Sequence, residues 1–109
     1  MATMTQQFRE VVLRLASSAD EQRAYLRKLG TAPLADELAL EFSDLLPVVQ
    51  DTLDESARRV ARRLDEYLVG FSGEANAELW TVDALERAPE WTRVRDLANE
   101  LLRHLDDPG

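Results

Sequence analysis

Residues 48–70 form the longest stretch of this chain with an unbroken helical period, and no Gly or Pro interrupts it before its last residue. When successive residues are placed about 100° apart around a helix axis, the apolar side chains fall on one arc about 120° wide. Such an arc is typical of a helix that faces a core. We therefore expect a central helix over about residues 48–69, with the rest of the chain packed around it. The arc comprises Val49, Leu53, Ala57, Val60, Ala61, Leu64, Tyr67 and Leu68.

The N-terminal part of the chain predicts either one helix or two. Apolar residues three and four positions apart indicate a first helix over residues 5–16, with Thr5 as its N-cap. Ser18 and Glu21 have the spacing of a capping box, which favours a second helix over about residues 19–29. The apolar stripe also continues across the two ranges, so a single continuous helix stays open as the alternative.

Proline and threonine residues mark the remaining helix boundaries. A third helix is expected from a Thr31 N-cap, and Pro47 either kinks that helix into the central one or opens the central helix. Thr81 is predicted to cap a short helix, and the strongly amphipathic residues after Pro89 predict the last helix. Residues 106–109 are interpreted as a short C-terminal tail.

The helical patterns together predict the fold class. No stretch shows the strict alternation of a β-strand, and no segment repeats along the chain. A chain of 109 residues is long enough to bury one hydrophobic core. The expected fold is therefore all-α: a single domain over residues 1–109, built as an irregular bundle of five to six helices around the central one.

Composition limits the classes of function. The chain has no Cys and one His, which excludes disulfides and thiolate metal sites and gives no reason to expect a cofactor. Its net charge of −8 argues against nucleic acid as a partner, because phosphates are bound by basic surfaces. A protein with a basic surface suits this charge better. No leader-like segment and no apolar run of membrane-helix length is present, so we expect a cytoplasmic protein without membrane association.

Two stretches, LRKLGTAPLADELALEF and AELWTVDALERAPEWTRVRDLA, resemble short helical proteins from GC-rich bacteria whose activity is not established. The resemblance spans roughly residues 26–102. It rests on similar strings of residues rather than on a motif with known chemistry. It therefore implies no role for any individual residue.

The first candidate site is the outer side of the third predicted helix, where Leu40 lies opposite the apolar arc. Carboxylates around this leucine would steer association with a basic partner, and the leucine would anchor the contact. The alternative is a solvated helix face with one exposed leucine. The acidic residues of this candidate are Asp36, Glu37, Glu41 and Asp44.

A second candidate consists of four arginines on two turns of the central stretch, which could bind a phosphate or an acidic partner through forked hydrogen bonds. Acidic residues four positions away, Asp54, Glu55 and Glu66, would pair with three of these arginines and neutralise much of the patch. A solvated helix face is therefore the alternative. The four residues are Arg58, Arg59, Arg62 and Arg63.

An enzymatic alternative rests on two pairs of acidic residues, each three positions apart. Such pairs on different helices resemble those with which all-α nucleotide pyrophosphohydrolases hold Mg²⁺. The pairs in those enzymes are mainly glutamates within a longer acidic motif, and no phosphate-binding lysine accompanies the pairs here. Unless the fold joins the two pairs, we expect no metal site. The pairs are Asp51 with Asp54 and Asp83 with Glu86.

Aromatic residues gather in sequence near Gly70. Tyr67, Phe71 and Trp80 could line a small-molecule pocket, but burial tendencies favour a cover over the end of the bundle. The one histidine, His104, is interpreted as a residue near the end of the last helix, where a positive charge is favourable.

The sequence as a whole favours a non-enzymatic protein-binding module, in the manner of an immunity protein, an antitoxin or a small regulator. The carboxylate–Mg²⁺ enzyme is the alternative. A homodimer formed through a helix face is compatible with both.

Overall fold

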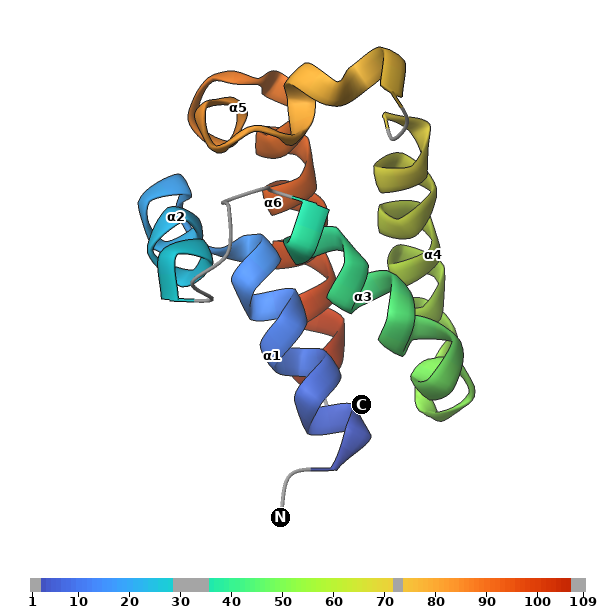
Figure 1. The fold of residues 1–109 in the computed structure, drawn as a ribbon. Coiled ribbons are helices and arrows are strands. Elements are labelled where there is room, and N and C mark those ends of the chain that lie inside the picture. The colour runs from blue at the N-terminus through green and yellow to red at the C-terminus, as the bar shows by residue number, and fades with distance from the viewer. Residues whose placement is uncertain (1–2, 29–35, 72–73, 107–109) are drawn as a thin grey trace.

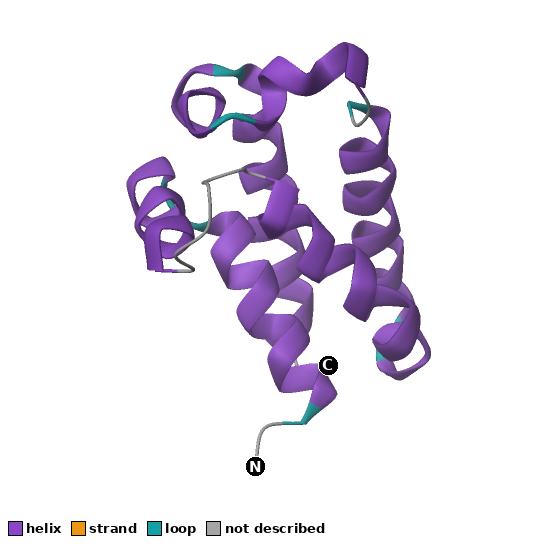
Figure 2. Cartoon of the chain, in the orientation of Figure 1, coloured by secondary structure: helices purple, strands orange, loops and turns teal. Residues whose placement is uncertain are grey.

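The computed structural model describes residues 3–28, 36–71 and 74–106. Within these ranges the chain folds into α-helices joined by short 3₁₀ segments and contains no strand (Figure 2). This confirms the expected all-α bundle. The elements are α1 Met4–Ala16, α2 Ala19–Lys28, α3 Asp36–Val49, η1 Gln50–Thr52, α4 Glu55–Gly70, η2 Glu74–Trp80, α5 Val82–Arg87 and α6 Pro89–Asp106.

The last helix, α6, occupies the position that was expected for the stretch at residues 48–70. Helices α1 and α4 both pack against α6, while α3 crosses the bundle in front of it and packs mainly on α1 (Figure 1). The apolar side of α6 is almost completely buried, as its amphipathic sequence requires. The prediction of a central helix over residues 48–69 was therefore wrong about which helix lies at the centre. The buried residues of α6 are Trp91, Val94, Leu97, Ala98 and Leu101.

The predicted start of the central helix at residue 48 was also wrong, because the helical conformation is interrupted between α3 and α4. Helix α3 continues through Pro47 to Val49, and α4 begins only at Glu55. The carboxylate of Asp54 accepts a hydrogen bond of 2.8 Å from the backbone N–H of Ala57 and so caps α4. The backbone of Asp54 is extended, as is usual for an N-cap residue, so the helix that precedes it cannot continue through this position.

The guanidinium group of Arg58 stabilises this break. Its Nε donates to the backbone carbonyl of Gln50 at 2.9 Å, and its Nη2 donates to the carbonyl of Leu53 at 3.0 Å. Carbonyl groups at the end of a helix have no partner within the helix, so a side chain that binds them offsets the interruption.

The predicted break between the first two helices is confirmed. Helix α1 ends at Ala16, α2 begins at Ala19, and the Ser18 hydroxyl accepts from the backbone N–H of Glu21 at 3.2 Å. The prediction that Thr5 caps the first helix was wrong, because Thr3 caps α1. The reason is a capping box with Gln6, in which the Thr3 hydroxyl and the Gln6 side chain each accept from the other residue's backbone N–H.

The later boundaries follow the sequence closely. The hydroxyl of Thr81 caps α5 by accepting from the backbone N–H of Ala84, and Pro89 opens α6. The predicted cap at Thr31 lies outside the described residues. Of the predicted tail, Asp106 is the last residue of α6 and residues 107–109 lie outside the described residues.

Candidate functional site

Helix α3 presents a mixed apolar and acidic surface to solvent. Its inner side chains pack on the core, while Leu40 and Val48 on the outer side keep 49% and 58% of their surface exposed. Asp44 is exposed, and Glu37 is half-buried. Neither carboxylate forms an ion pair with another residue in the described part of the chain. We call this surface the outer α3 face; it consists of Glu37, Leu40, Asp44, Pro47 and Val48.

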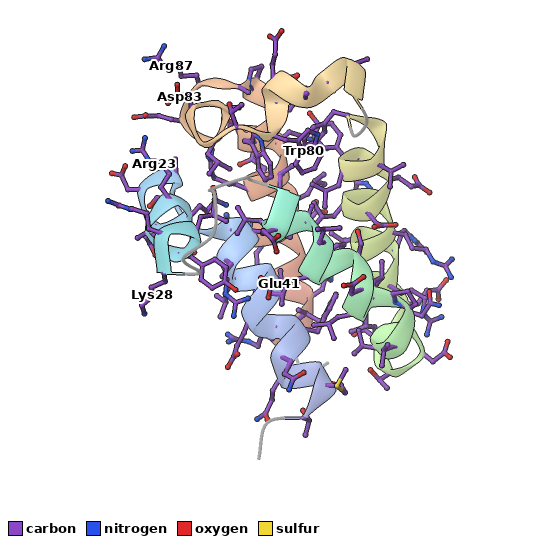
Figure 3. All side chains as sticks on the ribbon, in the orientation of Figure 1. Arg23, Lys28, Glu41, Trp80, Asp83 and Arg87 are labelled. Carbon is purple, nitrogen blue, oxygen red and sulfur yellow. The ribbon has the colours of Figure 1, made fainter. Side chains whose placement is uncertain are left out.

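One of the acidic residues predicted for this site, Glu41, does not belong to the outer α3 face. Glu41 forms an ion pair of 2.9 Å with Arg14 of α1 and accepts a hydrogen bond of 2.7 Å from the Tyr25 hydroxyl of α2 (Figure 3). The Arg14 guanidinium also lies 4.4 Å from the centre of the Tyr25 ring. Both carboxylate oxygens of Glu41 thus join three helices within the chain. The side chain of Asp36 lies outside the described part of the structure.

The contacts among Glu41, Arg14 and Tyr25 influence the pKa of the Tyr25 phenol, and this influence can be measured. Burial, and secondarily the hydrogen bond to Glu41, raises the pKa of the Tyr25 phenol. A pKa that is higher in the folded than in the unfolded state stabilises the fold below the unfolded value of about 10, and this contribution is lost as the pH rises through the folded value.

We expect Glu41→Gln to lower the pKa of Tyr25, because the substitution removes the negative charge beside the phenol. The titration is followed by tyrosinate absorbance in a Tyr67→Phe background, in which Tyr25 is the remaining tyrosine. Asp44→Asn on the same helix is the control and leaves the titration unchanged. If Tyr25 titrates at the same pH with Glu41 and with Gln at that position, the hydrogen bond is not formed in solution.

The four arginines of α4 have different environments. Arg58 is bound to two backbone carbonyls, as described above. Arg59 lies 3.4 Å from Glu55 on its own helix, and Arg63 lies 3.7 Å from Glu100 of α6. The predicted pair of Asp54 with Arg58 is replaced by the cap of α4 and the carbonyl bonds. The four arginines line a hollow of about 350 Å³ together with Glu55 and Glu66.

The four carboxylates of the enzymatic alternative are not brought together. Asp51 lies in η1 and Asp54 caps the start of α4, whereas Asp83 and Glu86 lie on α5 at the opposite end of the bundle (Figures 1 and 3). Glu86 forms an ion pair of 3.0 Å with Arg23 of α2. Among the residues that the structure describes, no group of three His, Cys, Asp or Glu side chains could hold a metal ion.

The aromatic residues near Gly70 pack on one another. Phe71 stacks on Trp80 with ring centres 4.8 Å apart, and both rings contact Trp91 edge-on. The Trp80 indole N–H donates to the Phe71 carbonyl at 2.8 Å, and the Trp91 indole N–H donates to the Leu79 carbonyl at 2.6 Å. These contacts support the predicted cover over the bundle and fix η2 to α6. The predicted helix-end residue His104 lies half-buried in the last turn of α6.

A buried polar network was missed in the sequence. Gln22 of α2 is 1% exposed, and its amide group donates to the carbonyls of Arg14 and Leu15 at 3.0 and 3.1 Å. Its carbonyl oxygen accepts from Arg95 of α6, which also donates to the Leu85 carbonyl. Burial lowers the pKa of Arg95, and the nearby charge of Asp96 opposes that shift. The sequence did contain a signal for this network, because Gln22 lies on the apolar stripe of α2 beside Leu26.

No family model matches this chain, and no curated protein or solved structure matches it significantly. None of the helices in the described ranges combines the length and apolar character needed to cross a bilayer.

Proposed function

We propose that this chain is a non-enzymatic protein-binding module, and that its partner docks on the outer α3 face. The observation that carries the proposal is the exposure of Leu40 between carboxylates that no residue of the described chain pairs with. An exposed leucine on a rigid helix can enter a pocket of a partner at little cost in conformational entropy. Val48 and Pro47 extend the apolar part of this surface by two turns.

The charge of the chain indicates the chemistry of the partner. A net charge of −8 attracts a basic surface over a distance of about one Debye length, and Glu37 and Asp44 supply negative charge beside the apolar contact. A basic protein with an apolar pocket is therefore the proposed partner. This manner of action is that of an immunity protein, an antitoxin or a small regulator.

We expect Leu40→Asp to weaken binding of this partner by at least about 30-fold, which corresponds to about 2 kcal/mol at a central apolar contact. The experiment purifies the tagged chain from its native cell, identifies the stoichiometric partner by mass spectrometry, and measures its affinity for both variants. Val69→Asp is the matched control, since Val69 of α4 is also an exposed aliphatic residue, at 60%.

Circular dichroism of each variant checks that the helical fold is retained. The proposal fails if no stoichiometric partner is recovered, or if Leu40→Asp and Val69→Asp bind the partner equally well. Light scattering distinguishes a homodimer, which would show twice the monomer mass without any added protein.

A further inference from the structure

The outer side of α4 carries the densest positive charge of an otherwise acidic chain. Arg59, Arg62 and Arg63 lie within two turns of the helix, so their Cα atoms span about 6 Å along its axis and about 100° around it. Side chains that end in nitrogen gather along this side of α4 in Figure 3. Together with their neighbours they line an open hollow of about 350 Å³ on the surface of α4.

The three guanidinium groups are available to a ligand. The contact of Arg59 with Glu55 is long and joins side chains that are 71% and 84% exposed, so it contributes little to stability. The contact of Arg63 with Glu100 is longer still. Arg62 forms no ion pair within the part of the chain that the structure describes. A ligand with several negative charges would therefore displace only weak contacts.

Arg58 also lines the hollow, but backbone carbonyls hold its side chain in place. Its Nε and Nη2 donate to the carbonyls of Gln50 and Leu53, which holds the start of α4 against the η1 turn. The first turn of the arginine surface is consequently anchored at a fixed position, while the other three side chains extend from it into solvent. Arg58 thus has a structural role, whereas the other three arginines do not bind the backbone in this way.

We propose that Arg59, Arg62 and Arg63 form a binding site for a compact anion with two adjacent phosphate groups. Guanidinium groups bind phosphate oxygens through paired hydrogen bonds and stay charged at all physiological pH values. Glu55 precedes the three arginines along α4 and Glu66 follows them; both also line the hollow and repel an anion that extends along the helix. A diphosphate fits between these two glutamates, whereas a long acidic peptide meets one glutamate or both.

The proposal predicts substitutions with opposite effects. Titration calorimetry with sodium pyrophosphate at low ionic strength measures the affinity of each variant. We expect Arg62→Gln to weaken binding roughly fivefold and Glu66→Gln to tighten it roughly threefold, because each removes one charge beside the ligand. Arg87→Gln on α5 removes an arginine elsewhere on the surface and leaves the affinity unchanged.

Further arms of the experiment identify the source of the diphosphate. If ADP also binds and loses affinity in Arg62→Gln, a nucleotide carries the group; if pyrophosphate alone binds, the free anion is the ligand. Either result supports the site. The proposal is overturned if millimolar pyrophosphate produces no heat and no change in the amide NMR shifts of α4. It is also overturned if Arg62→Gln binds pyrophosphate as well as Arg87→Gln does.

Discussion

Replacing Trp91 with alanine should lower the free energy of unfolding by about 3–5 kcal/mol. The Trp91 side chain is completely buried, and its ring contacts both Phe71 and Trp80 edge-on. Its indole N–H also donates to the Leu79 carbonyl, so the substitution leaves a cavity and a carbonyl without its donor. Such a loss is a large part of the 5–15 kcal/mol that stabilises an ordinary domain.

Urea unfolding followed by circular dichroism measures this effect. Trp91→Phe is the matched control, because it keeps an aromatic ring in the cluster and removes mainly the hydrogen bond. We expect it to cost about 1–2 kcal/mol. A loss below about 1 kcal/mol for Trp91→Ala would show that the aromatic cluster does not hold η2 against α6 in solution.

Replacing Gln22 with leucine should lower the free energy of unfolding by about 2–3 kcal/mol, although it introduces an apolar side chain of similar size at a buried position. Leucine cannot donate to the Leu15 carbonyl, which is buried, or accept from Arg95, which is half-buried. An unsatisfied buried polar group costs about 1–3 kcal/mol. The burial that lowers the pKa of Arg95 makes its loss of an acceptor more costly.

Gln7→Leu on α1 is the control for this prediction, because the same chemical change occurs there at an exposed position. We expect its effect to stay within about 0.5 kcal/mol. Urea unfolding of both variants makes the comparison. If the two variants have equal stability, the buried network around Gln22 contributes nothing to the fold.

The local signals in the sequence predicted the helices well. The capping pattern of Ser18 located the end of α1 and the start of α2, and Thr81 and Pro89 located the starts of α5 and α6. These signals act over three or four residues, through hydrogen bonds between a side chain and nearby backbone groups. Their effect is therefore visible in sequence. The same type of signal at Thr3 and Gln6 was overlooked.

The stretch at residues 48–70 shows where periodicity is insufficient. Val49 and Leu53 are both buried in the core, as the apolar arc required, yet they lie on opposite sides of a break in the helix. An apolar pattern records which side chains face the core, and a helix and a turn can both satisfy it. The choice between them depended on the Asp54 cap and on the carbonyl bonds of Arg58.

The candidate site was predicted only in part for a related reason. The exposure of Leu40 follows from its angle on α3, so the sequence was enough to find it. The engagement of Glu41 was not visible, because Arg14 and Tyr25 are 27 and 16 residues away in sequence. Contacts over such separations depend on how the helices cross, and helical periodicity contains no information about crossing.

The sequence by itself determined the fold class, most helix boundaries and the side of each helix that faces the core. These properties arise from hydrogen bonds and apolar spacing within a few residues. Tertiary structure alone decided that α6 lies at the centre, that Glu41 joins three helices, and that the carboxylates of α5 lie far from those at the start of α4. Each of these depends on contacts between distant segments, whose geometry is set only when the helices pack together.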